Sequence, residues 1–377
     1  MPISKRFVCL ITLSTLAACS QPVKPSPEAI PAQAAAAPLS PPPAVAAVPA
    51  AAAVAAPAVA DAPAAAAPSP DVLEAFVLET AASSGMPAAD IRAWLAQARF
   101  QQSIINAITR PAEGKPWKDY RPIFLTDTRI GQGRTFYAEH RSEVDGVAAR
   151  TGVPSEIIVA IMGVETSYGR ITGNYRVLDA LYTLAFYYPK RAEFFRSELA
   201  HLFALAREEK LDLSTLKGSY AGAMGWGQFM PSSYRNYARD GDGDGRRDLL
   251  GSTSDAFASI ANYFVGYGWR SGEPVMVRAQ ADAGAAPYTA DGYEPNTTLA
   301  ALAARGYRPA VPVPGEERAT LFTLDGVDGK EYWLGFQNFY AITRYNNSRH
   351  YAMAVHELAE AIAGRQVASV DAGQPGA

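Results

Sequence analysis

The sequence predicts a mainly α protein with one small β-containing insertion. Apolar residues return at three- and four-residue intervals over 178–187, 192–208, 232–238 and 255–266, the spacing of amphipathic helices. Between 271 and 333 the pattern changes to short runs such as PVMVRAQ and KEYWLGF among Gly, Pro and Asp, which is typical of strands. Helical character resumes over 352–363.

The N-terminus has the features of a bacterial lipoprotein signal. Lys5 and Arg6 give a basic start, 7–16 is an apolar core, and the run LAAC ends at Cys19, which together predict a signal peptide over 1–18. The apolar core is too short to span a membrane. A lipidated Cys19, carrying palmitate or a similar chain, would anchor the mature protein without spanning. The alternative is an ordinary cleaved signal in which Cys19 is incidental.

Residues 19–70 are predicted to be a lipidated start and a tether. Ala and Pro dominate this stretch, and such a composition favours extended chain over a packed core. Ser20 directly follows the cysteine; by resemblance to bacterial lipoproteins, this non-acidic residue implies the periplasmic face of the outer membrane. The only other cysteine, Cys9, would leave with the signal. A formal charge of -3 over 377 residues argues against nucleic acid as a partner.

The composition is globular from Asp71 onward. We expect an N-terminal helical domain, a helical core, the β-containing subdomain, a return to the core and a flexible tail. The predicted boundaries are 71–150, 151–270, 271–333, 334–364 and 365–377.

One carboxyl group stands at the end of a predicted buried helix. The run PSEIIVAIMGVE, 154–165, opens with Pro and Ser and is almost wholly apolar until Glu165, so it predicts a core helix. A carboxyl group half in an apolar wall has its charged form disfavoured and can serve as a general acid. The alternative is a helix-end glutamate paired with Arg170 or Arg176.

A glycine-rich loop is the second candidate for chemistry. Residues 218–233 read GSYAGAMGWGQFMPSS and lead into a predicted helix. Glycines permit close backbone approach, and polar groups among aromatic rings suit a sugar. A glycine-rich structural turn is the alternative.

Five blocks in order carry a family resemblance: ETSYGRITGNYRVLDAL, YPKRAEFF, KGSYAGAMGWGQFMPSSYRNYA, ANYFVGYGW and TRYNNS. From about Ala75 to about Ala363 the chain resembles the membrane-bound lytic transglycosylase B family of peptidoglycan-cleaving enzymes. The resemblance implies a lysozyme-like helical core with a further helical domain and a small β domain. Its single catalytic carboxylate matches Glu165. Phe194 stands where some relatives have Tyr. The residues that match sugar-groove positions are Tyr120, Ser219, Gln228, Tyr263, Tyr345 and Asn346.

The resemblance also implies a reaction without water. Glu165 would protonate the oxygen of the β-1,4 bond between N-acetylmuramic acid and N-acetylglucosamine, and then deprotonate the muramyl 6-hydroxyl to leave a 1,6-anhydromuramyl end. Ser219 and Gln228 would bind the acetamido group, and Tyr345 and Asn346 would orient Glu165. No cofactor is needed for this chemistry. The partners implied are peptidoglycan glycan strands. Cell-wall synthesis proteins are further candidates, and the enzyme itself is expected to be a monomer.

Two other function classes stay open at this point. One is a lysozyme proper, in which water replaces the 6-hydroxyl. The other is a non-catalytic wall-binding lipoprotein, which would not need an acid in an apolar wall.

The segment HELAE at 356–360 has no second histidine at the spacing of a zinc protease, so it does not predict a metal hydrolase.

An aspartate-rich loop predicts a structural Ca²⁺. Counted from Asp240, the loop has carboxylates at its first, third and fifth positions and glycine at the sixth. This pattern fits an EF-hand loop. Position twelve is Gly251 in place of the usual Glu, so closure must come from elsewhere. The resemblance implies Asp255, and Asp248 is an alternative; a turn without metal is the other interpretation. The predicted ligands are Asp240, Asp242, Asp244, the Arg246 carbonyl and Asp255.

Overall fold

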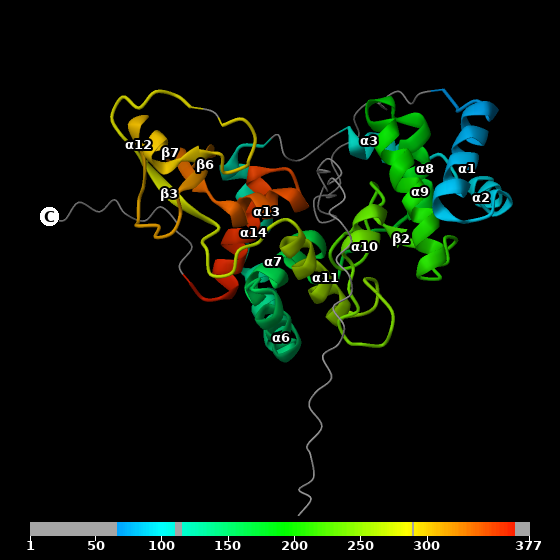
Figure 1. The fold of residues 1–377 in the computed structure, drawn as a ribbon, viewed down its shortest axis with the longest axis horizontal. Helices are drawn as coiled ribbons and strands as arrows, with labels where there is room; N and C mark the ends of the chain where they lie inside the picture. Colours follow the sequence, from blue (N-terminus) through cyan, green and yellow to red (C-terminus); the bar gives the residue numbers. More distant parts are fainter. Residues whose placement is uncertain (1–65, 110–114, 289, 366–377) are drawn as a thin grey trace, which may run out of the picture. The chain divides into compact units, whose positions relative to one another are not determined.

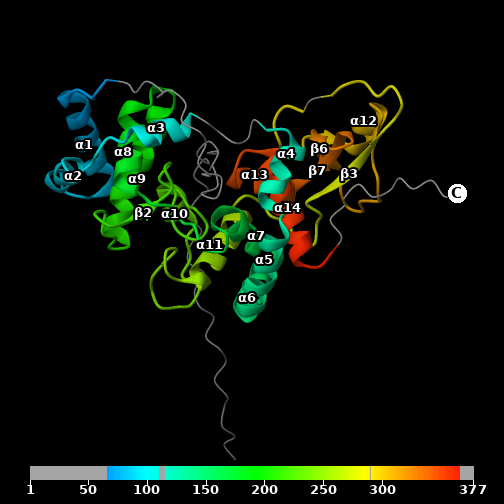
Figure 2. The same ribbon diagram turned by 180° about the vertical axis from the view of Figure 1, so that it is seen from behind.

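The computed structural model describes residues 66–109, 115–288 and 290–365. Cys19, the signal and the predicted tether as far as residue 65 lie outside the described residues. Within them the chain forms fourteen α-helices and seven short strands, shown in Figure 1 and from behind in Figure 2. The prediction of a mainly α protein with a small sheet is confirmed.

Six helices make up the N-terminal part of the described chain. Helix α1 begins at Pro70, where Ser69 accepts a hydrogen bond from the Val72 amide, and it ends at Gly85 in the left-handed conformation, as helices commonly do. The bounds are α1 Pro70–Ser84, α2 Ala88–Leu95, α3 Gln102–Ile108, α4 Trp117–Phe124, α5 Asp127–Glu139 and α6 Arg141–Thr151.

Five helices form the middle of the chain and match the predicted ones within one or two residues at most boundaries. All residues of α7 except Glu156 are buried, which confirms the predicted core helix. The bounds are α7 Ser155–Thr166, α8 Val177–Tyr187, α9 Ala192–Glu208, α10 Pro231–Tyr237 and α11 Thr253–Gly266.

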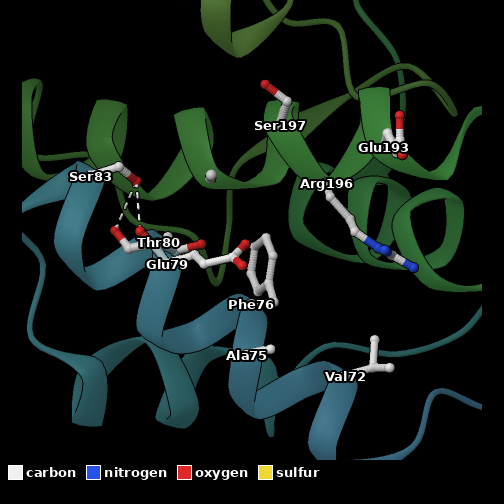
Figure 3. Close-up of a pocket in the computed structure, with 10 residues that line it drawn as sticks. Val72, Ala75, Phe76, Glu79, Thr80, Ser83, Glu193, Arg196 and Ser197 are labelled. Carbon is white, nitrogen blue, oxygen red and sulfur yellow. Dashed lines mark hydrogen bonds between the residues drawn. The ribbon is translucent and has the colours of Figure 1, made fainter.

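Helices α1 and α9 enclose a groove of about 480 Å³, lined by Phe76 and Thr80 on one side and Glu193 and Arg196 on the other (Figure 3).

The strands of the insertion form one antiparallel sheet with its own small core. The strand order is β4-β6-β7-β3-β5, and Leu302, Leu321 and Phe336 are among the residues of its separate apolar cluster. The bounds are β3 Met276–Ala281, β4 Thr297–Thr298, α12 Leu299–Ala304, β5 Tyr307–Pro309, β6 Arg318–Gly326 and β7 Gly329–Gly335. Outside it, β1 Tyr175–Arg176 pairs with β2 Lys217–Gly218.

The last two helices return to the main core. Helix α13 covers Gln337–Tyr345 and α14 covers Arg349–Ile362, and α14 packs beside α7 (Figures 1 and 2). Arg365, the first residue of the predicted tail, forms ion pairs with Glu156 and Glu360; residues 366–377 lie outside the described part.

No single helix of the described chain is long and apolar enough to cross a membrane. The bent pair Arg141–Thr151 and Ser155–Thr166 meets the length and composition criteria only when its two helices are taken together, across a bend of 116°.

Candidate active site

Glu165 is completely buried near the C-terminal end of α7. Its Oε1 accepts a hydrogen bond of 2.7 Å from the hydroxyl of Tyr351, in the first turn of α14. This donor stabilises the carboxylate form, while the apolar surroundings favour the neutral form. The position therefore combines the two influences that an acid/base group needs to exist in both protonation states.

Tyr351 lies outside the set of site residues that the sequence predicts. Its side chain is fully buried; burial, and next the negative charge of Glu165, raise the pKa of its hydroxyl well above the ordinary value. It therefore stays protonated and donates. The signal that could have found it is its place six residues after Tyr345, in the first turn of a helix that is otherwise almost wholly buried.

The glycine-rich loop lies directly against the end of α7. The hydroxyl of Thr166 donates to the Trp226 carbonyl at 2.9 Å, and within the loop Met224 and Phe229 form a β-bridge. A Cβ on Gly169 would overlap the Trp226 ring, so glycine is required for this close approach. The loop thus packs against the helix end that carries Glu165.

Ser219 and Gln228, both predicted sugar ligands, are almost completely buried in this loop. Ser219 Oγ accepts from the amides of Ala221 and Ala223 at 3.3 and 3.1 Å, which leaves its hydroxyl hydrogen to donate. Gln228 has a φ of 50°, and its Nε2 donates to the Thr172 carbonyl at 3.0 Å. Its buried Oε1 has no hydrogen-bond partner among the described residues.

The predicted aromatic residues pack around the same region. Tyr345 Oη donates to the Gly227 carbonyl and Tyr263 Oη to the Arg344 carbonyl, each at 2.5 Å. The two rings lie 4.8 Å apart at 61°. Asn346 is completely buried directly after α13. The bond that holds Glu165 thus comes from Tyr351, while the Tyr345 hydroxyl orients the loop.

Tyr120 lies near Phe124, His350 and Tyr351. Its side chain is 1% exposed, and its ring centre lies 5.4 Å from His350 and 5.2 Å from Phe124. An electrostatic interaction with Tyr120 contributes to the raised pKa of the Tyr351 hydroxyl. Tyr120 is therefore almost as deeply buried as Glu165 and Asn346.

The acidic loop between α10 and α11 brings three carboxylates together. Ligand oxygens of Asp240, Asp242 and Asp244 lie within 4.8 Å of one another, and all three residues are exposed. Carboxylate oxygens at this spacing suit a hard cation such as Ca²⁺.

Asp255, the predicted closing ligand, is buried beside the acidic loop and not in the group of three. Its Oδ1 accepts from the Gly241 amide at 2.7 Å and its Oδ2 from the Asp248 amide at 2.6 Å. Burial raises the pKa of Asp255, although these two bonds oppose the rise. In this structure Asp255 fixes the backbone at both ends of the loop.

Comparison with known proteins assigns the chain to a family. The family described as Transglycosylase SLT domain matches residues 69–360, which include Glu165, the glycine-rich loop and the acidic loop. The chain belongs to this family.

Relatives of this transglycosylase agree along most of its length. The membrane-bound lytic murein transglycosylase B of Escherichia coli (strain K12) is 47% identical over 247 residues, 66% of this chain and 67% of that protein. The structure of the catenated lytic transglycosylase SltB1 from Pseudomonas aeruginosa has 46% identity and a TM-score of 0.75, covering 79% of this chain and 98% of that one.

Two further structures were solved with bound molecules. The Escherichia coli lytic transglycosylase Slt35 in complex with calcium has 41% identity and a TM-score of 0.71, covering 77% of this chain and 92% of that one. SltB3 from Pseudomonas aeruginosa in complex with NAG-anhNAM-pentapeptide has 33% identity and a TM-score of 0.67, covering 78% of each chain.

Proposed function

We propose that this lytic transglycosylase cleaves the β-1,4 bond between N-acetylmuramic acid and N-acetylglucosamine in peptidoglycan and leaves a 1,6-anhydromuramyl end. The observation that carries the proposal is Glu165, a buried carboxyl group at a helix end beside a polar, glycine-rich loop. The SltB3 structure in complex with NAG-anhNAM-pentapeptide supports it, because that molecule contains an anhydro sugar.

Glu165 would act first as acid and then as base. Protonated, it gives its proton to the glycosidic oxygen as the bond to the muramyl anomeric carbon breaks, and the muramyl acetamido oxygen stabilises the developing positive charge. As a carboxylate it then takes the proton of the muramyl 6-hydroxyl, whose oxygen attacks the anomeric carbon. The carboxyl group is regenerated, and no water is consumed.

The other buried carboxylates of the described chain support a mechanism with one acid. A hydrolytic glycosidase usually needs two carboxyl groups flanking the bond. Here each of the others is held by protein donors: Asp179 by the Arg99 amide, Glu198 by Ser232, Asp255 by two loop amides and Glu357 by Arg121. With these carboxylates engaged by protein donors, the substrate's acetamido and 6-hydroxyl groups would take the role of the second carboxyl group.

The remaining site residues would bind and orient the sugar. Gln228 Oε1 is a buried acceptor suited to the acetamido N–H, and Ser219 offers a hydroxyl donor. Tyr263, Tyr345 and Asn346 would shape the sugar-facing wall. Tyr120, whose ring lies beside those of Phe124 and His350, would contribute to the same wall.

The proposal also covers the domains, the membrane anchor and the partners of the enzyme. The core over 151–270 would be lysozyme-like, with the helical domain over 71–150 and the β subdomain over 271–333 flanking it. Lipidation at Cys19 would anchor the enzyme at the periplasmic face of the outer membrane, and the membrane-bound name of the Escherichia coli relative supports this. Cell-wall synthesis proteins would be its partners, and the enzyme itself a monomer.

Calcium would have a structural role in this enzyme. Asp240, Asp242 and Asp244 would supply carboxylate oxygens, and the Arg246 carbonyl a fourth ligand. The Slt35 structure in complex with calcium supports the assignment. Asp255 would join the ligands only by giving up one of its amide bonds, so we assign it first to holding the loop.

Mass spectrometry of products released from purified peptidoglycan tests the reaction. The proposal expects anhydromuramyl ends. Reducing ends, heavier by one water per cleavage, would identify a lysozyme on the same scaffold. Binding without cleavage would identify a wall-binding lipoprotein, whose binding would survive a substitution of Glu165.

A further inference from the structure

The turn that follows Glu165 has a strained backbone. Ser167 and Tyr168 both adopt the left-handed conformation, with φ of 51° and 62°, and Gly169 continues it with 79°. Residues with a Cβ seldom adopt this conformation because Cβ crowds the backbone carbonyl. Contacts from outside the turn must therefore hold it in place.

The ring of Tyr168 provides such contacts by filling a slot between two helices. A Cβ on Gly163 of α7 would come within 2.7 Å of Tyr168 Cζ. A Cβ on Gly133 of α5 would overlap the Tyr168 hydroxyl and would also crowd the Ile362 side chain of α14. The ring is 6% exposed and lies 5.5 Å from the Phe136 ring. Both glycines are thus needed for the ring to fit.

Hydrogen bonds attach the same turn to α5 and α7. Tyr168 Oη donates to the Arg129 carbonyl at 3.0 Å, and Arg129 Nη2 donates to Ser167 Oγ at 3.2 Å. The Tyr168 amide donates to the Met162 carbonyl at 3.0 Å. Burial raises the pKa of the Tyr168 hydroxyl far above its ordinary value, so it remains a donor at all working pH values.

We propose that Tyr168 is a positioning residue for Glu165. Its ring, held between Gly133 and Gly163, fixes the last turn of α7 and so the direction in which Glu165 presents its carboxyl group. The proposal rests on the acid/base role of Glu165 in the proposed function. A misplacement of about 1 Å can lower a rate about a hundredfold, so displacing the ring should lower turnover in a protein that still folds.

Gly133→Ala is the test, with Gly131→Ala as the matched control. Both glycines lie in α5, but a Cβ on Gly131 meets nothing within 4 Å. With soluble glycan strands as substrate, Gly133→Ala should lower kcat at least about tenfold with KM changed less than about twofold. Gly131→Ala should keep both constants. A Gly133→Ala enzyme with unchanged kcat would overturn the proposal.

A second substitution tests whether the displaced ring is the cause. Tyr168→Phe removes the hydroxyl that the new Cβ would overlap, so the double variant Gly133→Ala/Tyr168→Phe should recover part of the lost kcat. Because the new Cβ also crowds Ile362, Gly133→Ala/Ile362→Val is the matched comparison and should recover less. Recovery with Ile362→Val alone, or no recovery with Tyr168→Phe, contradicts the proposal.

If Gly133→Ala fails to fold, Tyr168→Leu takes its place, since it retains apolar volume without a planar ring. A Tyr168→Leu kcat equal to wild type overturns the proposal. Glu165→Gln, measured in parallel, separates the two claims: an active Glu165→Gln enzyme removes the proposed function itself, whatever the Tyr168 variants do.

Discussion

The hydroxyl of Tyr351 donates a 2.7 Å hydrogen bond to Oε1 of Glu165, from a position 186 residues further along the chain. It joins the first turn of α14 to the last turn of α7. Because a buried carboxylate is costly unless a donor compensates it, this bond makes the charged half of the proposed acid/base cycle accessible.

Glu165→Gln should lower activity at least about a thousandfold, because one residue supplies both the acid and the base step. The amide oxygen can still accept from Tyr351, so the melting temperature should hardly change. Release of anhydro products from purified peptidoglycan measures the effect. Glu156→Gln, on the same helix, is the control and should stay active. An active Glu165→Gln enzyme would show that another group does the chemistry.

Tyr351→Phe should lower kcat about tenfold and move the alkaline limb of the pH–rate profile to higher pH. Glu165 must be protonated before the bond is cleaved, and without the donor that stabilises its charged form it keeps its proton to higher pH. Profiles of kcat against pH for wild type and variant measure this. Tyr332→Phe, in the β subdomain, should leave the profile unchanged. A Tyr351→Phe profile that coincides with wild type would count against the bond's role.

Calcium should raise the melting temperature by about 5 °C at saturating concentration, because a ligand that binds only the folded state stabilises it. Turnover should change little. Isothermal titration of chelator-treated protein should give heat that Asp240→Ala/Asp244→Ala abolishes. Asp212→Ala, an exposed aspartate outside this loop, is the control. No heat and no thermal shift in the wild type would leave an acidic turn without metal.

Glu198→Gln should remove a pH dependence of stability. Burial raises the pKa of Glu198, although hydrogen bonds from Ser232 oppose the rise. A carboxyl group whose pKa is higher in the folded state stabilises the fold at low pH, and that contribution is lost as the pH rises through the folded value. The free energy of unfolding of Glu198→Gln relative to wild type should therefore increase as the pH rises above the ordinary glutamate pKa. Glu193→Gln, exposed on the same helix, should show no such trend, and a flat difference for Glu198→Gln would refute the prediction.

Cys19→Ala should abolish lipid attachment and release the protein from the membrane fraction, whereas Cys9→Ala should be processed normally. Membrane fractionation with labelled palmitate measures both. A protein that begins at Ala66 keeps the Ser69 cap of α1 and should be soluble and still cleave isolated wall. Failure of this shortened protein to fold would show that the preceding Ala/Pro stretch does more than connect.

Much of the fold follows from short-range sequence signals. The core helix at 155–166, the long helix at 192–208 and the strands between Met276 and Gly335 lie close to where periodicity and turn residues put them. Such signals can be recognised in a sequence because side-chain directions repeat every 3.6 residues in a helix and every two residues in a strand. Glu165 was equally visible, as the one acid closing an apolar helix.

The contacts that complete the site were decided by the tertiary structure. Tyr351 reaches Glu165 across 186 residues, Tyr120 packs beside His350, and Asp255 binds loop amides. No local pattern records which side of a helix faces which neighbour, because that choice depends on how all the buried side chains fill the space together. The sequence therefore determined the elements and the acid, and packing determined which groups surround it.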